Sequence, residues 1–474
     1  MKRSDQGPEK SCCNQSNRQY KKYPDELFHI GLLWQHSLSR RKADDILESQ
    51  MRKLYSLFIY LATPLVLFYF LFRGLRDRNY LKRWPERFGL FTALPSAGSI
   101  VVHAASMGEV NAASSLVTAL LKRYPGVPLC LTTLTPTGSN RVRELFADTV
   151  SHVYIPLDLP GAVRRFYARV RPRLLIILET EIWPNLYHEA RARDIPMMMV
   201  SARISEKSVG NYHRFRGLTS AALKDVTQIA AQSDRDAARL VEIGADETRV
   251  TVTGNLKFDV RLPPSLLEQG ESIRLAWGTN RLVLLGGSTH EDDEGPVIEA
   301  FCRLLETFSS ALLVLVPRHP ERFSRTAQLA RAAGLRVALR SEGASCAHDT
   351  QCFVVDTMGE LLRYYAACDV AFVGGSLAGT GGHNVLEPAA LSKPVLVGPN
   401  TFNFKDITQQ LIECQGALRI RNAAELEQAV SRLFSEPELR DRMGRAGHDL
   451  VQSGQGALNR TLELIDGLIT PATG

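Results

Sequence analysis

Apolar residues fill one segment near the N-terminus without a break. Residues 54–72 are 19 consecutive positions without a charge, with Arg52 and Lys53 before them and Arg73 after them. A stretch of this length can span a bilayer. Pro64 near its middle also permits a kinked or shallowly inserted helix. Because no small-residue cleavage site follows, we expect an uncleaved membrane anchor at residues 51–73 and not a signal peptide.

Two points about this segment stay open. A buried core helix of a soluble protein is the alternative, which we disfavour because the segment is apolar on every face. Basic residues on both flanks leave the orientation in a membrane undecided. Residues 1–50 are polar, have no strong apolar period and are interpreted as an N-terminal extension.

Beyond Arg87, short apolar runs alternate with amphipathic segments, which is typical of a parallel α/β sheet. A first series of strands is predicted at 99–103, 127–132, 152–155, 174–178, 197–201, 228–231 and 250–253. A second series is predicted at 282–285, 311–316, 336–339, 352–355, 370–373, 394–397 and 417–420. A stretch containing Pro263 and Pro264 separates them. The pattern predicts two doubly wound domains, 74–260 and 261–474, whose strand C-termini face a shared cleft.

Composition and charge narrow the class of protein. The 474 residues are 45% hydrophobic and 23% charged, which is typical of globular domains. Residues 73–220 hold 21 Lys/Arg against 11 Asp/Glu, whereas residues 221–474 hold 25 against 32. A basic region behind an apolar segment suits an anionic membrane surface better than nucleic acid, because basic stretches interleaved with aromatic residues are missing. The eight scattered cysteines are interpreted as reduced thiols of a cytoplasmic protein.

Candidate chemistry follows several predicted strands of the first domain. Glu109, in Ser106-Met107-Gly108-Glu109, could accept a proton from a sugar hydroxyl, or it could merely be favoured by the dipole at a helix start. Glu179 and Glu181 leave another strand, and we expect at most one of them to face the chemistry. Lys257, in Asn255-Leu256-Lys257-Phe258-Asp259, could meet a leaving phosphate as a compact charge.

Glycine-rich and cationic loops follow the strands of the second domain. Residues 286–290 and 317–320 could offer backbone amides and a cation to a nucleotide, and Asp356-Thr357-Met358-Gly359-Glu360 follows a later strand. The densest motif begins at Gly374 and ends in His383-Asn384-Val385-Leu386-Glu387-Pro388. Its amides could bind phosphate and its carboxylate could reach ribose hydroxyls. No His/Cys/Asp/Glu spacing resembles a metal site, so we expect no metal and no cofactor.

Together these motifs resemble the 3-deoxy-D-manno-octulosonic acid (Kdo) transferase family of lipopolysaccharide biosynthesis. The resemblance covers residues 51 to about 468 and rests on the basic anchor, Ser106-Met107-Gly108-Glu109, Glu179-Thr180-Glu181-Ile182-Trp183-Pro184-Asn185, Asn255-Leu256-Lys257-Phe258-Asp259, Pro317-Arg318-His319-Pro320 and His383-Asn384-Val385-Leu386-Glu387-Pro388. It implies a GT-B fold of two Rossmann-like domains. It also implies inverting, metal-independent transfer of Kdo from CMP-Kdo to a lipid A precursor (lipid IVA), by an inner-membrane protein whose catalytic domains lie on the cytoplasmic face.

The resemblance also implies roles for individual residues. Glu109 would be the general base, and Glu179 and Lys257 would stabilise the transition state. The C-terminal domain would hold CMP through Pro317, Arg318, Met358, Gly359, Glu360, Asn384, Val385, Leu386 and Glu387. The first 50 residues have no counterpart in the family.

Two other functions are kept as alternatives. A soluble nucleotide-sugar epimerase would use a similar cleft, but it has no need for the apolar segment. A catalytically silent membrane scaffold would keep the fold for binding, and the dependence of activity on Glu109 would distinguish it. The number of Kdo units transferred, their linkages and the oligomeric state are not predicted.

Overall fold

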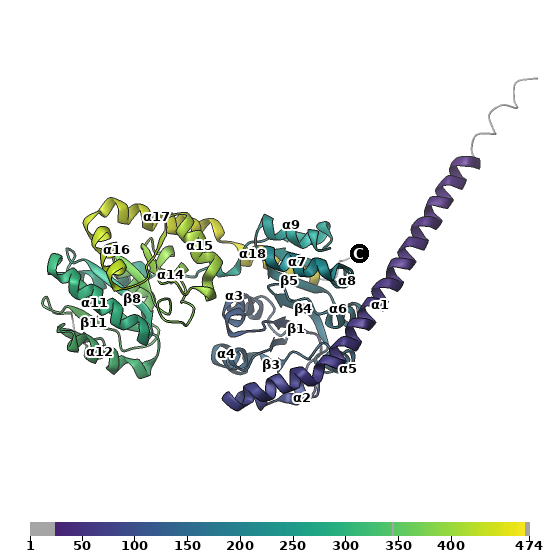
Figure 1. Cartoon of the computed structure of the whole chain (residues 1–474), viewed down its shortest axis with the longest axis horizontal. Coiled ribbons are helices and arrows are strands. Elements are labelled where there is room, and N and C mark those ends of the chain that lie inside the picture. Colours follow the sequence, from purple (N-terminus) through teal and green to yellow (C-terminus); the bar gives the residue numbers. More distant parts are fainter. Residues whose placement is uncertain (1–23, 344–345, 470–474) are drawn as a thin grey trace, which may run out of the picture.

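The computed structural model describes residues 24–343 and 346–469, with side chains from Ser49 onward. It consists of two α/β lobes side by side and a long N-terminal helix, α1 (Pro24–Arg76), that runs along the first lobe (Figure 1). The extension predicted for residues 1–50 lies largely outside the residues whose side chains are described.

The first lobe is built on a parallel seven-stranded sheet with the order β3-β2-β1-β4-β5-β6-β7. Its strands are β1 (Ser99–His103), β2 (Leu129–Thr133), β3 (Ser151–Tyr154), β4 (Pro172–Leu178), β5 (Met197–Ala202), β6 (Gln228–Ala231) and β7 (Val250–Val252). Its helices are α2 (Trp84–Arg87), α3 (Met107–Arg123), α4 (Pro136–Phe146), α5 (Pro160–Val170), α6 (Pro184–Arg191), α7 (Glu206–Arg214), α8 (Arg216–Lys224) and α9 (Asp234–Glu242). Alternate residues of β1 and β4 enter two different apolar cores, because both faces of the sheet are covered.

The second lobe repeats this plan with the parallel order β10-β11-β9-β8-β12-β13-β14. Its strands are β8 (Val283–Thr289), β9 (Leu312–Pro317), β10 (Val337–Leu339), β11 (Cys352–Val354), β12 (Val370–Val373), β13 (Val395–Val397) and β14 (Ala417–Arg419). The helices after β7 are α10 (Leu266–Trp277), α11 (Glu291–Thr307), α12 (Phe323–Ala332), α13 (Leu361–Ala367), α14 (Leu386–Ala390), α15 (Lys405–Glu413), α16 (Ala423–Ser435), α17 (Pro437–Gly454) and α18 (Ala457–Ile469). The prediction of two doubly wound domains of the GT-B kind is confirmed.

Each sheet has a switch point where the strand order reverses, between β1 and β4 in the first lobe and between β8 and β12 in the second. Ligands of doubly wound sheets bind outside the carboxyl ends of the strands at such a point. Glu109 follows β1 and Glu179 follows β4, while the glycine-rich loop that begins at Gly374 follows β12. The topology therefore gathers the candidate residues of each lobe at its switch point.

One expected loop is part of a strand. The sequence predicted that a strand would end at 285 and a loop would occupy 286–290, but β8 continues to Thr289. Gly286 and Gly287 pair with β9 on one side and β12 on the other. A side chain at Gly287 would collide with the hydroxyl of Tyr365. These glycines therefore permit close packing over the sheet, and the loop begins later than expected.

The chain crosses between the lobes twice, and one carboxylate joins the two crossings. Residues after Leu256 lead into the second lobe, and α18 returns at the end of the chain to pack in the same apolar core as β1. The sequence had placed residues 457–469 with the second domain. Asp259 accepts hydrogen bonds from the backbone N–H of Gly456 at 2.7 Å and of Leu458 at 2.6 Å. The domain boundary near residue 261 itself stays a prediction.

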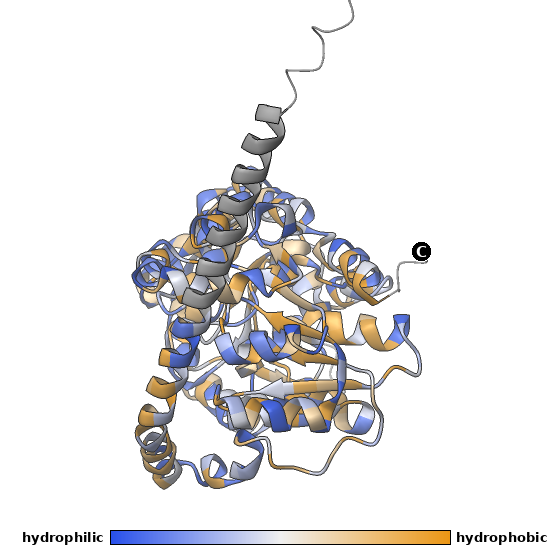
Figure 2. Cartoon of the chain, turned by 90° about the vertical axis from the view of Figure 1, so that its right-hand side faces the viewer, coloured by the Kyte–Doolittle hydropathy of each residue, from blue (hydrophilic) through white to orange (hydrophobic). Residues whose placement is uncertain are grey.

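The expected anchor forms the last part of α1. The stretch Ser49–Arg76 is long and apolar enough to cross a membrane, and only 11% of its most apolar window is buried. Orange apolar residues run along this part of the helix in Figure 2. A buried core helix, the alternative from the sequence, would be mostly enclosed, so this exposure argues against it.

The Asp259 contacts lead to a first prediction. Asp259→Asn should weaken the docking of α18 by about 1–3 kcal/mol, because two backbone N–H groups lose a charged acceptor. Hydrogen exchange of the α18 amides measures this loss directly. Asp148→Asn, at an exposed position of the same lobe, should leave the exchange unchanged; equal protection in both variants would contradict the role of Asp259.

Candidate active site

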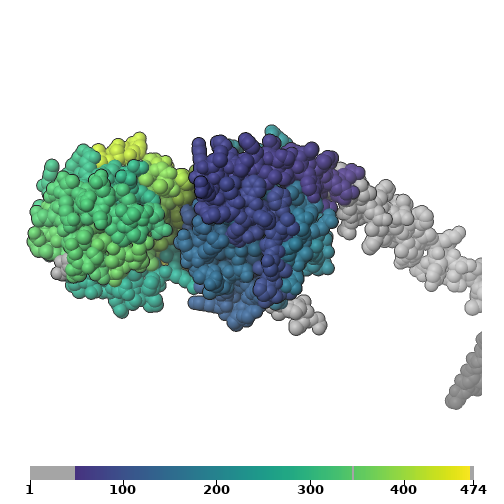
Figure 3. Space-filling model, turned by 90° about the horizontal axis from the view of Figure 1, so that it is seen from below, coloured from purple at the N-terminus to yellow at the C-terminus, as the bar shows by residue number. Residues whose placement is uncertain are grey.

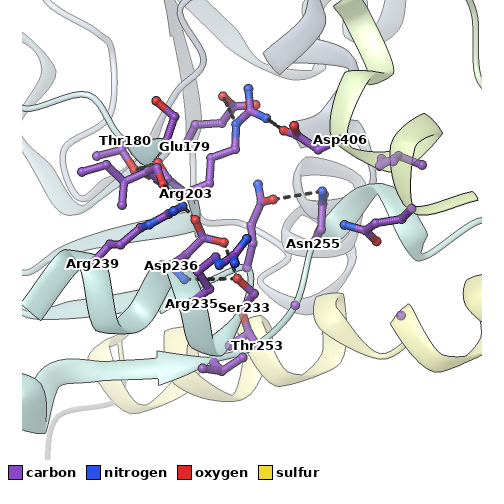
Figure 4. A pocket seen from close by; sticks show the side chains of 18 of the residues that line it. Glu179, Thr180, Arg203, Ser233, Arg235, Asp236, Arg239, Thr253, Asn255 and Asp406 are labelled. Carbon is purple, nitrogen blue, oxygen red and sulfur yellow. Dashed lines mark hydrogen bonds and ion pairs between the residues drawn. The ribbon is translucent and has the colours of Figure 1, made fainter. Parts of the chain in front are cut away.

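A cavity of about 1130 Å³ lies between the lobes and is lined by both of them. Figure 3 shows the two lobes as separate masses that meet along a furrow. The first lobe contributes Glu109, Glu179 and Glu181, and the second contributes Lys405 and Asp406 from the start of α15. The expectation that at most one of Glu179 and Glu181 would face the site is therefore wrong. Figure 4 shows polar side chains from several elements pointing into this space. The cavity is thus a polar cleft between the two sheets.

Glu109 is held at the start of α3 by its immediate neighbours. Ser106 caps the helix, and its hydroxyl accepts a hydrogen bond from the Glu109 N–H at 3.4 Å. In return, one Glu109 carboxylate oxygen accepts the Ala105 N–H at 2.8 Å and the other accepts the Ser106 hydroxyl at 3.0 Å. The helix-start role is therefore present in the structure. Each oxygen keeps a further lone pair, so this role does not exclude proton transfer.

The surroundings of Glu109 favour its neutral form. Burial, together with the charges of Glu181 and Glu179, raises its pKa to about 7, although the Ala105 hydrogen bond opposes this shift. A carboxyl with a pKa near neutrality is suited to accept a proton at physiological pH. Burial and the neighbouring carboxylates of Glu181 and Glu179 thus give Glu109 a pKa that suits a general base.

Glu181 is tied to a buried histidine. Its carboxylate lies 2.8 Å from Nε2 of His103, which is fully buried, and it also accepts the indole N–H of Trp183 at 3.1 Å. The other ring nitrogen of His103 lies 2.9 Å from the Thr132 hydroxyl. Although burial raises the pKa of Glu181, these hydrogen bonds and the histidine lower it overall. Glu181 therefore keeps its negative charge beside Glu109.

Glu179 leaves β4 in a strained backbone conformation. Its φ is 57°, in the left-handed region that non-glycine residues rarely adopt, and Ser201 at the end of β5 has a φ of 52°. Such strain is concentrated at functional sites. The Glu179 carboxylate lies 3.2 Å from Nε of Arg203. Arg203 also pairs with Asp406 of the second lobe, so a chain of charges crosses the cleft (Figure 4).

Lys257 lies close to these charges without lining the cavity. Its ammonium is 5.5 Å from the centre of the Phe404 ring. Burial lowers the pKa of Lys257, Arg203 lowers it further, and the carboxylates of Glu179 and Glu109 oppose this shift. The structure therefore brings the three predicted catalytic residues, Glu109, Glu179 and Lys257, into one electrostatic cluster.

The residues predicted to bind CMP gather at the strand ends of the second lobe, outside the lining of the cavity. Burial raises the pKa of Glu387, and the hydrogen bond from Asn384 and the charge of Arg318, which follows β9, oppose this shift. The Asn384 side-chain amide donates to Glu387 at 3.1 Å. These contacts place Arg318, Asn384 and Glu387 in one group. Pro317 ends β9, and Val385 and Leu386 are buried beside this group.

The third predicted nucleotide loop has a visible structural role. Gly359 has a φ of 83°, and Met358 beside it is exposed. The Glu360 carboxylate accepts hydrogen bonds from the Thr357 hydroxyl at 2.6 Å and from Arg340 at 3.2 Å. Glu360 therefore holds its own loop together, and a role in binding CMP stays a prediction.

Sequence reasoning missed the residue that organises the glycine-rich loop. Asp293 in the first turn of α11 is fully buried. Its carboxylate accepts the N–H groups of Gly375 at 2.6 Å, Leu377 at 3.0 Å and Ala378 at 3.1 Å, as well as that of His290 at 2.9 Å. One carboxylate thus fixes four backbone groups around the switch point of the second lobe. The acidic run 291–294 looks like an ordinary helix start, so no local signal identified it.

Two histidines join the same region. Nε2 of His290 and Nε2 of His383 are 2.8 Å apart, and the rings are stacked with their centres 5.1 Å apart. Burial and the charge of Arg318 lower the pKa of His383 to about 3, so this pair shares one proton in a neutral hydrogen bond. Among the described residues, no group of three or more His, Cys, Asp or Glu is placed to hold a metal ion.

The chain is similar to known proteins in sequence and in fold. Residues 82–260 match the family model described as 3-deoxy-D-manno-octulosonic-acid transferase (kdotransferase). The 3-deoxy-D-manno-octulosonic acid transferase of Haemophilus influenzae is 38% identical over 87% of this chain and 98% of its own.

Two solved structures are also similar. The C-terminal CMP-Kdo binding domain of WaaA from Acinetobacter baumannii is 34% identical, with 40% of this chain and 98% of that domain covered and a TM-score of 0.39. The UDP-GlcNAc 2-epimerase of Neisseria meningitidis bound to UDP-GlcNAc has a TM-score of 0.50 at 13% identity, over 77% of this chain and 99% of that one. At this identity the likeness to the epimerase concerns the fold alone.

The charges around Glu109 lead to a prediction about its titration. In a chain with labelled glutamate, the Glu109 carboxyl should titrate near pH 7 by NMR. Glu181→Gln should move the midpoint towards the ordinary range of about 4.3, because it removes the negative neighbour. Glu144→Gln, an exposed residue of the same lobe, is the control. A midpoint that does not move in Glu181→Gln would contradict the electrostatic coupling.

The contacts of Asp293 lead to a further prediction. Asp293→Asn should speed hydrogen exchange of the Gly375, Leu377 and Ala378 amides, by an amount that corresponds to about 1–3 kcal/mol of lost protection. Asp292→Asn is the matched control, since Asp292 is exposed one residue earlier in the same helix. Unchanged exchange at these amides in Asp293→Asn would show that the loop is held by other contacts.

Proposed function

The chain belongs to the Kdo transferase family, the glycosyltransferases that attach Kdo in lipopolysaccharide biosynthesis. From this premise we propose that it transfers Kdo from CMP-Kdo to lipid IVA, with inversion at the sugar carbon and without a metal. We further propose Glu109 as the general base.

One observation carries the proposal for the base. Glu109 is a carboxyl at the switch point of the first lobe, it lines a cleft shared by both lobes, and its pKa is raised to about 7. A carboxyl with a pKa near 7 is partly deprotonated at neutral pH, and its deprotonated form is basic enough to take the proton of an attacking hydroxyl. Glu179 and Glu181 line the same cleft but differ, since Glu179 is paired with Arg203 and the pKa of Glu181 is lowered.

The acceptor oxygen attacks the anomeric carbon of Kdo from the side opposite CMP, and its proton passes to Glu109. The bond between that carbon and the phosphate oxygen breaks, and CMP departs with the electron pair. Lys257 would neutralise the growing phosphate charge, while the carboxylate of Glu179 would stabilise positive charge on the sugar. Opposite-side attack inverts the configuration.

The second lobe would hold the donor. Its switch point offers the guanidinium of Arg318 for phosphate, the amides of the glycine-rich loop, and the Glu387 carboxylate for the ribose hydroxyls. Pro317, Met358, Gly359, Glu360 and the 384–387 segment would complete the CMP site. The Arg203–Asp406 pair spans the cleft and links the two lobes beside this site.

The alternatives are less well supported. The fold is shared with a nucleotide-sugar epimerase, but sequence identity over nearly the whole chain lies with Kdo transferases. A silent scaffold would give no reason for a buried carboxyl of raised pKa in the cleft. We therefore propose a membrane-bound enzyme, anchored by α1 in the inner membrane with its lobes in the cytoplasm. The six cysteines whose side chains are described are all free thiols, which suits that compartment.

The proposed roles predict opposite kinetic effects of two substitutions. Glu109→Gln should lower kcat about 10²- to 10⁴-fold with CMP-Kdo and lipid IVA, while calorimetry shows unchanged CMP binding, because the amide keeps its size but takes no proton. Glu387→Gln should weaken CMP binding roughly 10- to 100-fold and change turnover little at saturating donor.

Glu144→Gln is the control for both substitutions, and each assay is repeated with excess chelator. Near-normal turnover of Glu109→Gln would place the base elsewhere, with Glu179 and Glu181 as the next candidates. Activity that is lost in chelator and restored by a divalent ion would overturn the metal-free mechanism.

A further inference from the structure

We propose that the apolar part of α1 lies parallel to the membrane surface and inserts one face into a single leaflet, without crossing the bilayer. The inference deepens the membrane association proposed above. It depends on how α1 is attached to the first lobe.

The inward face of the apolar part of α1, residues 54–72, is docked on the first lobe near both ends of that part. At one end, the Ser56 hydroxyl and the Arg52 guanidinium lie 3.0 Å and 3.4 Å from the side-chain oxygen of Asn185, which is buried at the start of α6. At the other end, Phe70 is buried. Its ring stacks on Tyr80 with the centres 6.3 Å apart, and the Arg87 guanidinium lies 4.4 Å from the Phe70 ring centre.

The docked positions repeat with the period of a helix. Residues 52, 55, 56, 59, 62, 63, 66, 67, 70 and 74 are all buried or half-buried, and they form one continuous stripe. Figure 3 shows this part of the chain lying across the surface of the first lobe. Residues 52–74 of α1 are therefore attached to the lobe along their whole length, whereas the N-terminal part of the helix extends beyond the lobe (Figure 1).

The opposite face of α1 is apolar and open. Its exposed large side chains are Leu54, Leu57, Phe58, Leu61, Leu65, Phe68, Tyr69, Phe72 and Leu75. An uncovered apolar stripe of this extent marks a surface that is covered in the working protein. Arg73, Arg76, Arg78 and Lys82 are exposed at its C-terminal end, where anionic headgroups would attract them. Apolar side chains beside basic ones fit a lipid leaflet better than a second copy of this basic chain.

A membrane-spanning α1 conflicts with these contacts. From Ser56 to Phe70 the helix rises roughly 21 Å, a large part of a hydrocarbon core of about 30 Å. The lobe flanks α1 over that whole distance, so crossing would carry Asn185, Asp158 and Arg87 to the depth of the acyl chains. Asp158 is a buried carboxylate that accepts the N–H groups of Asn185 and Leu186. Undocking α1 instead would break the contacts of Arg52 and Ser56 with Asn185 and separate the Phe70 ring from Tyr80.

A depth measurement separates the two arrangements. A fluorescent amino acid replaces Phe58, Leu65 or Phe72 in the full chain, bound to vesicles of phosphatidylethanolamine and phosphatidylglycerol with lipid-borne quenchers at a shallow and a deep position. The in-plane helix predicts strongest quenching by the shallow quencher, to the same extent at all three sites. An N-terminal epitope tag should also be reached by antibody from the side on which the lobes lie.

Two results would overturn the proposal. A Leu65 probe quenched most by the deep quencher, with the tag on the opposite side from the lobes, would show a spanning helix. Absence of quenching at all three sites would show that the face is covered by a protein. Neither readout uses turnover, so failure here is distinct from failure of the proposed reaction. Leu61→Glu with Leu65→Glu should reduce vesicle binding at least tenfold, whereas Glu144→Gln, on another surface of the same lobe, should not.

Discussion

The parallel arrangement of every strand is the constraint on which the rest of this structure depends. Parallel strands need helical crossovers on both faces, so the faces are closed and only the strand ends remain for chemistry. In each lobe the order reverses once, beside β1 in the first and beside β8 in the second. The lobes are joined by two crossings tied at Asp259. The switch point of the first lobe opens on the cleft between them, which the start of α15 lines from the second lobe. A reaction between two bound molecules suits that geometry, since each lobe can hold one reactant.

Glu109 shows how this architecture creates reactivity at a cost in stability. Burial beside Glu181 raises its pKa from 4.5 to about 7, so between those values the folded chain holds a proton that the unfolded chain has released. Folding stability therefore falls as pH rises through this window. The hydrogen bonds from Ala105 and Ser106 offset part of that cost. The contacts that cap α3 also orient the carboxylate in the cleft.

The sequence predicted all of the strands that the structure describes, because most of them are buried on both faces and are short, continuous apolar runs. It failed at Gly286 and Gly287, where glycines that permit packing against Tyr365 look like a turn. Glu109, Glu179 and Lys257 could be proposed from local motifs and do cluster. Asp293 and Asp406 could not, because their partners are distant in the chain and any acidic helix start has the same pattern. The docking of α1 was equally invisible, since its inward and outward faces are both apolar.

The most direct test of the account is the transfer reaction itself. Purified full-length protein in phospholipid vesicles is incubated with CMP-Kdo and lipid IVA, and the lipid product is analysed by mass spectrometry and by NMR of its anomeric carbon. The account predicts release of one CMP for each Kdo that is added, with the opposite anomeric configuration to that of the donor. A product with the configuration of the donor would contradict single-step attack assisted by Glu109, and CMP release without a lipid product would contradict the proposed acceptor.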